Sequence, residues 1–134
     1  MNQVIFQCED STEGIFTGVY DAWASRLGHG NVKLEAGTGH EMELFSEYRS
    51  VETDREKAEK VASTVRKSMG FGCWESIYQA TLAEGEEKAE AVYRSIVLGI
   101  SMARRKNGSV HRLMENIQEP CIFQIMTLSR AVAR

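Results

Sequence analysis

Residues 4–27 constrain the fold more than any other stretch, because they combine a short apolar run, a polar corner and an amphipathic segment. The run at residues 4–6 favours a strand. Asp10 followed three residues later by Glu13 is typical of a helix start, since both side chains can bond N–H groups of the first turn. Apolar residues then recur at helical spacing, and Gly28 is placed to end the helix. Its broad buried face is predicted to hold Ile15, Phe16, Val19, Tyr20, Ala22, Trp23 and Leu27.

The segment after Gly28 alternates apolar and polar residues, which predicts a half-exposed strand through Val32, Leu34 and Ala36. Residues 37–39, Gly-Thr-Gly, fit a hairpin turn, and Met42, Leu44 and Tyr48 would continue on the other arm. With the N-terminal run, this gives a small sheet of about three strands. A phosphate-binding loop is a weaker interpretation of these glycines, because the full glycine spacing and a closing Lys-Ser/Thr are missing.

The rest of the chain has the periodicity of helices. Thr53 with Glu56 predicts a capping box, and apolar residues then continue at helical spacing to Met69. Gly70 and Gly72 are expected to break that helix. Further helices are predicted at residues 73–85, 86–106, 110–117 and from 120 to the chain end. The predicted fold is a single α+β domain over residues 1–134, mostly helical, with the small N-terminal sheet packed against five or six helices.

The overall composition fits a globular domain. At 134 residues the chain can bury a core without disulfides, and no apolar run approaches the roughly 18 to 20 residues that span a bilayer. No signal peptide is recognisable, so we expect a cytoplasmic protein. Three cysteines that are far apart predict buried free thiols. Neither the cysteines nor the histidines have the close spacing of a metal site, and no cofactor is predicted. These residues are Cys8, Cys73, Cys121, His29, His40 and His111.

Charge is divided unevenly between the two halves of the chain. Residues 1–59 hold twelve acids and five bases, net −7, whereas residues 60–134 hold seven acids and eleven bases, net +4. The densest basic cluster follows the helix at 86–106 and is predicted to contact phosphate oxygens through cationic side chains and helix N–H groups. The alternative is a solvated helix end that complements its dipole. The cluster comprises Arg104, Arg105, Lys106, Ser109, His111 and Arg112, and Arg66, Lys67, Arg130 and Arg134 extend it if the helices pack that way.

Other reactive side chains have simpler structural interpretations. The carboxylates of Glu9, Asp10 and Glu13 could pair as acid and base, but capping and solvation explain them better. Cys8 at the helix start could have a lowered pKa, which the neighbouring carboxylates oppose. Trp23 and Trp74 could stack on nucleic-acid bases, yet their helical spacing favours the core. The sequence therefore assigns no catalytic residue.

Three motifs carry a resemblance to a known family. Asp-Ser-x-Glu-Gly at residues 10–14 runs into Ile-Phe-Thr-Gly-Val-Tyr-Asp-Ala-Trp, and the run from Ser50 to Val61 forms a second motif. Gln-Glu-Pro-Cys at residues 118–121, before residues 127–134, forms a third. The order resembles a bacterial family associated with DNA metabolism, whose genes tend to lie beside a radical-SAM partner related to spore photoproduct lyase. A related domain of unknown function occurs fused to uracil-DNA glycosylases.

The resemblance implies a role in DNA repair or modification. Members of the family continue beyond the residue that matches Arg134, with a Glu, a His and a Gly-Phe-x-Arg-Phe element, so we expect this chain to be an N-terminal portion. The leading hypothesis is an accessory domain that binds the phosphate backbone of DNA weakly and without sequence preference. The alternatives are an adaptor or homodimer for the radical-SAM partner, and part of an enzyme acting on damaged bases. The adaptor surface would be Ile122, Phe123, Ile125 and Met126.

Overall fold

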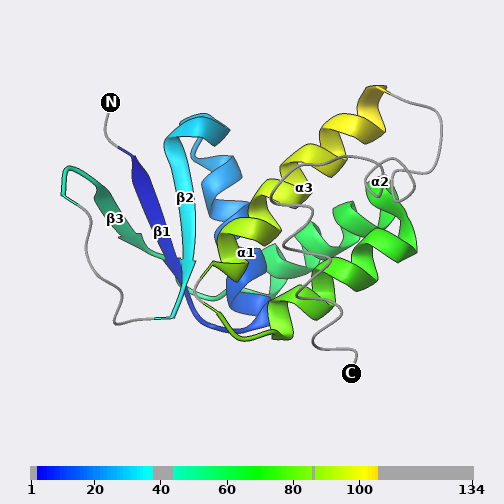
Figure 1. Cartoon of the computed structure of the whole chain (residues 1–134), viewed down its shortest axis with the longest axis horizontal. Helices are drawn as coiled ribbons and strands as arrows, with labels where there is room; N and C mark the ends of the chain where they lie inside the picture. Colours follow the sequence, from blue (N-terminus) through cyan, green and yellow to red (C-terminus); the bar gives the residue numbers. More distant parts are fainter. Residues whose placement is uncertain (1–2, 38–43, 86, 106–134) are drawn as a thin grey trace.

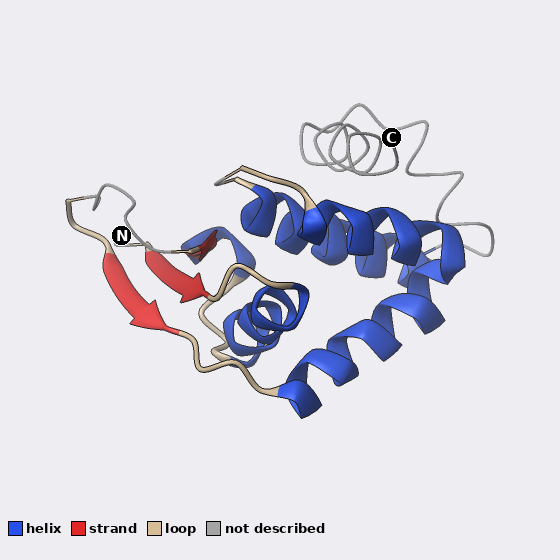
Figure 2. Cartoon of the chain, turned by 90° about the horizontal axis from the view of Figure 1, so that it is seen from below, coloured by secondary structure: helices blue, strands red, loops and turns tan. Residues whose placement is uncertain are grey.

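The computed structural model describes residues 3–37, 44–85 and 87–105. Figure 1 shows a sheet on one side of the molecule and the helices on the other, and Figure 2 shows the same two layers from below. The elements in chain order are β1 (Val4–Cys8), α1 (Thr12–Ala24), the 3₁₀ turn η1 (His29–Asn31), β2 (Val32–Ala36), β3 (Glu47–Ser50), α2 (Arg55–Leu82) and α3 (Lys88–Arg105).

The three strands form a parallel sheet in the order β2-β1-β3. Val4 lies opposite Val32 on one side and Glu47 on the other. The predicted hairpin is therefore wrong, because β2 and β3 lie on opposite sides of β1 rather than beside each other. The reason is burial: Ile5 and Phe6 point to opposite faces and are both buried, which places β1 at the centre. Met42 lies outside the described residues.

Helix α1 begins one residue later than predicted. The Ser11 hydroxyl, not the Asp10 carboxylate, accepts a hydrogen bond from the Gly14 N–H at 2.9 Å. Asp10 instead forms an ion pair with Lys88 of α3, at 2.5 Å. The helix ends at Ala24, before the predicted Gly28, and the chain then turns through Arg26 at a φ of 57°. Sequence alone thus located the helix but placed its start one residue too early and its end a few residues too late.

Helix α2 folds back on itself at Gly70, where φ is 86° and ψ is 169°. A straight helix of 28 residues would be about 42 Å long. Both ends of α2 nevertheless reach α1, because Thr17 Oγ1 bonds the Asp54 carbonyl at 3.1 Å and Thr12 bonds Thr81 at 2.7 Å. The predicted break at Gly70 is confirmed, and Figure 1 shows the chain folding back there. The N-cap is Asp54 rather than the predicted Thr53.

The described residues contain three α-helices and not the predicted five or six. One reason is that the helices predicted before and after Gly70 together form α2. The other is that the helices predicted at 110–117 and from 120 onward lie outside the described residues. The prediction of an α+β fold with a three-stranded sheet is confirmed. No helix in the described part of the chain is both long and apolar enough to cross a membrane.

Helix α3 covers the outer edge of the sheet. Glu90 accepts a hydrogen bond from the Leu34 N–H at 3.1 Å, and the Arg94 guanidinium donates to the carbonyls of Val32 and His29. Glu90 and Arg94 also form an ion pair at 2.9 Å. These bonds satisfy backbone groups of β2 that another strand would otherwise bond. The edge of β2 is therefore closed, and α3 is fixed with its C-terminal half pointing away from the sheet (Figure 1).

Candidate binding groove

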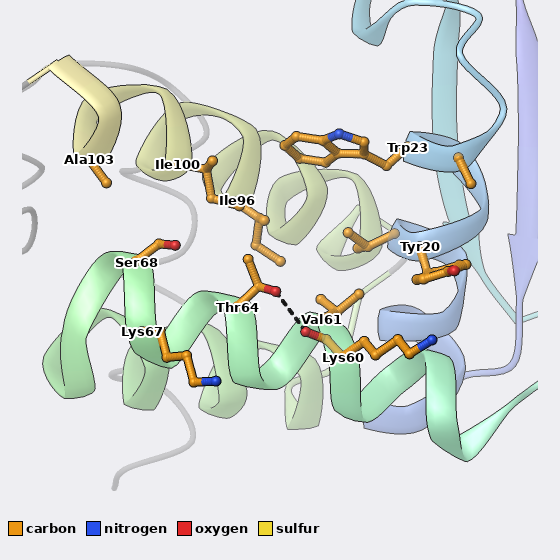
Figure 3. A pocket seen from close by; sticks show the side chains of 12 residues that line it. Tyr20, Trp23, Lys60, Val61, Thr64, Lys67, Ser68, Ile96, Ile100 and Ala103 are labelled. Atoms are coloured by element: carbon orange, nitrogen blue, oxygen red, sulfur yellow. Dashed lines mark hydrogen bonds between the residues drawn. The ribbon is translucent and has the colours of Figure 1, made fainter.

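A groove with a volume of about 620 Å³ lies among α1, the first half of α2 and α3. Figure 3 shows α2 as one wall and α3 as the other, with α1 closing one end. Its lining residues are Val19, Tyr20, Trp23 and Ala24 from α1, Lys60, Val61, Thr64, Lys67 and Ser68 from α2, and Ile96, Ile100 and Ala103 from α3. The groove therefore depends on how these three helices pack against one another.

The closed end of the groove is aromatic. Trp23 contacts His29 edge-on, with ring centroids 4.6 Å apart and an interplanar angle of 68°. His29 Nδ1 in turn lies 2.6 Å from the hydroxyl of Tyr93, a fully buried side chain of α3. Figure 3 shows the Trp23 indole reaching from α1 over the groove toward Ile96. Trp23 is therefore supported from behind by a histidine that α3 holds in place.

The protonation states of the His29 and Tyr93 pair follow from their surroundings. Burial raises the pKa of Tyr93 to about 12, so its hydroxyl keeps the proton at neutral pH. Burial and the nearby Arg94 guanidinium lower the pKa of His29 below its ordinary value, which favours the neutral ring. At neutral pH their hydrogen bond therefore joins a neutral imidazole to a neutral hydroxyl.

Two lysines on the rim distinguish the groove from its surroundings. Lys57 forms an ion pair with Asp21 at 3.0 Å, and Arg66 forms one with Glu59 at 2.8 Å. Lys60 and Lys67, by contrast, lie within ion-pair distance of no carboxylate in the described ranges. Figure 3 shows their side chains on the α2 wall with the ammonium groups directed away from the interior. The rim can therefore receive an anion while the interior remains apolar.

The hydroxyls in the groove differ in how they are engaged. Thr64 Oγ1 donates to the carbonyl of Lys60 at 2.8 Å, the bond that Figure 3 marks with a dashed line. The Ser68 hydroxyl points toward the space between α2 and α3 in the same view. Ser68 therefore gives the apolar groove a hydroxyl directed into the space between α2 and α3.

The predicted basic cluster begins at the open end of this groove. Arg104 and Arg105 are the last residues of α3 and directly follow Ala103, which lines the groove. Lys67, which was predicted to extend the cluster, is on the rim of the groove. Arg66 instead lies over Trp74, with its guanidinium carbon 4.8 Å from the ring centroid. The remaining members lie outside the described residues: Lys106, Ser109, His111, Arg112, Arg130 and Arg134.

The candidate reactive groups are engaged elsewhere. Cys8 and Cys73 are buried, as predicted, and burial raises the pKa of Cys8 to about 12, the opposite of an activated thiol. Glu9 accepts hydrogen bonds from Ser11 at 3.1 Å and Thr53 at 3.0 Å. The residues that the structure describes contain no group of three side chains that could hold a metal ion. His40, His111 and Cys121 lie outside those residues.

Sequence reasoning missed most of the groove. It favoured the core for Trp23 and Trp74, and both are partly buried and pack against the core. Trp74 packs between Phe16 and Tyr78, with ring centroids 5.7 Å away on each side, whereas Trp23 also lines the groove. Helical spacing shows which residues share a face but not how α1, α2 and α3 pack to leave a groove between them. The available signal was the occurrence of two aromatic residues three positions apart at the end of α1.

Comparisons of the chain with protein-family models, with curated proteins and with solved structures found no match.

Proposed function

We propose that this protein is a nucleic-acid-binding accessory module that contacts phosphates at the rim of the groove. The observation that carries the proposal is the pair of rim lysines, Lys60 and Lys67, without carboxylate partners in the described part of the chain. The end of α3 adds Arg104 and Arg105 in sequence directly after the groove residue Ala103. The family resemblance supports the same role in DNA repair or modification, beside a radical-SAM partner.

Phosphate contacts of this kind predict weak, sequence-independent binding. Each phosphate neutralised by a lysine or arginine releases bound counterions, so the affinity decreases linearly with salt on logarithmic axes. The acidic first half of the chain opposes wrapping of nucleic acid around the whole protein. Contact is therefore expected on the side where α2 and α3 form the groove.

The direct test is a titration of the protein against labelled single-stranded and double-stranded DNA at low salt, repeated at several salt concentrations. We expect measurable binding at low salt and a linear log–log decrease, whose slope is about 0.7 per phosphate contacted on a single strand. The double variant Lys60→Gln/Lys67→Gln should bind more weakly and lower the slope by about 1.4, the equivalent of two phosphates.

A charge-matched control separates the rim from net charge. Lys33→Gln/Arg55→Gln removes the same two charges from β2 and from the first residue of α2, neither of which lines the groove. This control should retain the salt slope of the original protein. Equal loss in both double variants, or no loss in Lys60→Gln/Lys67→Gln, would reject the rim as the phosphate contact.

The predicted cluster beyond Ala103 has its own test. Replacing Arg104, Arg105 and Lys106 together by Ala should abolish measurable binding if these residues make most of the phosphate contacts. Full retention of binding by this triple variant would remove the cluster from the site and leave the lysines of α2 as the only contacts proposed here.

A second candidate function, a protein–protein adaptor or homodimer, is favoured by one surface of α2. The adaptor surface predicted from the sequence lies outside the described residues: Ile122, Phe123, Ile125 and Met126. Phe71, Tyr78 and Leu82 of the second half of α2 are 71%, 40% and 51% exposed and follow one another at helical spacing. Exposed large apolar side chains on one helix face are typical of interaction surfaces. A solution mass that rises with protein concentration, abolished by Phe71→Glu/Leu82→Glu, together with no DNA binding, would favour this function over the first.

A further inference from the structure

We propose that the groove receives a single unpaired nucleobase, which stacks on Trp23, so that the module prefers single strands to duplex. This inference depends on the nucleic-acid binding proposed above and assigns the part of the ligand that enters the groove. The rim would hold the phosphates on either side of the inserted base.

The dimensions and chemistry of the groove fit such a ligand. Its volume of about 620 Å³ falls within the range of small-molecule sites, and its walls carry Val61, Ile96 and Ile100. An apolar interior of this kind excludes a phosphate, because desolvation of the charge would not be repaid. A flat, uncharged ring with polar edges is accommodated, since the walls contact its faces and Ser68 can bond its edge (Figure 3).

Trp23 is the stacking surface within this groove. Its indole is held edge-on by His29, and the Tyr93 hydrogen bond fixes His29 in turn. A platform positioned in this way loses little rotational freedom when a base binds, which favours affinity. Tyr20 lies beside Trp23 at the closed end, with the Lys60 ammonium 6.0 Å from its ring centroid. Aromatic surface and cation therefore occur side by side, as they do in proteins that bind single strands.

Duplex DNA does not offer a base to such a groove. Its bases are paired and stacked, and extrusion of one costs unstacking and unpairing energy. A single strand presents bases already exposed on a flexible backbone. The difference between the two ligands, rather than affinity for either alone, is therefore the signature of base insertion.

The experiment compares three labelled probes of equal length: twelve-nucleotide oligothymidylate, a twelve-unit strand of abasic deoxyribose phosphates, and a twelve-base-pair duplex. The abasic strand keeps the phosphates and lacks the bases. We expect oligothymidylate to bind about tenfold more tightly than the abasic strand by fluorescence anisotropy, as base–aromatic stacking on one residue would give. In a Trp74→Phe background, where Trp23 is the sole tryptophan, oligothymidylate but not the abasic strand should quench the indole fluorescence.

Two variants test the groove independently. Trp23→Leu keeps an apolar side chain and removes the aromatic face, and it should reduce oligothymidylate binding to the level of the abasic strand while the abasic affinity stays unchanged. Ala103→Trp retains Trp23 and fills the open end of the groove, and it should have the same effect. If Trp23→Leu does not fold, the affinities of Ala103→Trp for oligothymidylate and the abasic strand test base insertion by themselves.

The outcomes separate this inference from the function on which it rests. Equal, salt-sensitive binding of oligothymidylate and the abasic strand would overturn base insertion and leave phosphate binding at the rim intact. Base insertion would likewise be overturned if Ala103→Trp folds and still binds oligothymidylate tenfold more tightly than the abasic strand. No binding of any of the three probes at low salt would overturn both proposals together.

Discussion

Two regions of this molecule could in principle hold a ligand, and they differ in how their polar groups are used. Open parallel sheets usually bind ligands beyond the carboxyl ends of their strands. In this protein, that region contains Glu9, Asp10 and Ser11 after β1. Glu9 accepts from Ser11 and Thr53, and Asp10 forms an ion pair with Lys88. The carboxyl-end region therefore joins β1, α1, α2 and α3 to one another.

The groove has the opposite character. Its interior is apolar, and the rim lysines Lys60 and Lys67 have no carboxylate partner in the described ranges. Polar groups that bond one another stabilise the fold, whereas charges left beside open apolar surface are available to a ligand. This difference favours the groove over the sheet as the binding site, and substitutions in the two regions should have different consequences.

The largest effect is expected where α1 begins against β1. A Cβ on Gly14 would lie 2.4 Å from the backbone oxygen of Glu9. Because that oxygen belongs to the main chain, the clash can be removed only by shifting the backbone. Gly14→Ala should destabilise the protein by about 3 kcal/mol, after subtracting the roughly 1 kcal/mol that alanine gains over glycine in a helix. Urea unfolding measures the change.

Gly30→Ala is the matched control for that substitution. A Cβ at Gly30 would meet no atom within 4 Å, so the change should remain within about 0.5 kcal/mol. Equal stability of the two variants would show that the junction of β1 and α1 is looser than the contacts indicate.

The second prediction applies one substitution to both regions. Lys88 is 5% exposed, and its ammonium bonds the Ala83 carbonyl at 2.6 Å and Asp10 at 2.5 Å. Lys88→Met should cost about 2 kcal/mol of unfolding free energy, because a buried carbonyl and a carboxylate lose their partner. Lys67→Met on the rim should cost less than about 0.5 kcal/mol and instead weaken DNA binding. A larger loss of stability in Lys67→Met than in Lys88→Met would contradict the roles proposed for the two regions.

A third, smaller effect concerns high pH and the buried thiol of β1. Burial, with a contribution from Asp21, raises the pKa of Cys8 from 9.0 to about 12. The folded state therefore holds this proton more strongly than the unfolded chain, and the stability that results is present below about pH 9 and lost as the pH rises toward 12. We expect a loss of about 1 kcal/mol between pH 9 and 10 in urea unfolding. The unfolding free energy of Cys8→Ala should decrease less steeply over that interval. The slope that remains is due in part to Tyr93.

The sequence predicted the fold where the signals are local. The break at Gly70 was found because glycine interrupts a clear apolar period, and α1 and α3 were found from their periodicity. The strand pairing was not found, because Gly37 gives a local turn signal whereas the parallel order depends on burial of β1 on both faces. Among the residues that line the groove, the sequence had singled out Lys67 as an extension of the basic cluster and Trp23 as a side chain that could stack on bases, although it favoured the core for Trp23. The groove itself arises from the packing of α1, α2 and α3 against one another, which no single stretch of sequence encodes.

The smallest predicted effect concerns acid and the histidine behind the groove. Burial and the Arg94 guanidinium lower the pKa of His29. The charged groups that face it come from α3, namely Arg94 and its partner Glu90, while α1 contributes the uncharged Trp23. The folded state therefore binds this proton less readily than the unfolded chain. The corresponding stability is present above the ordinary histidine pKa of about 6.5 and is lost as the pH decreases through that value toward the lower folded pKa.

NMR titration of the His29 ring protons should give a pKa below 6.5, and Arg94→Met should move it back toward 6.5 because the nearby positive charge is removed. In the Trp74→Phe background, the fluorescence of Trp23 should change over the same pH interval, since His29 contacts the indole directly. A His29 pKa at or above 6.5 would contradict the geometry assigned to His29 and Trp23. Trp23 fluorescence that stays constant while His29 titrates would contradict it as well. Trp23 would then be positioned by helix packing alone, without support from His29.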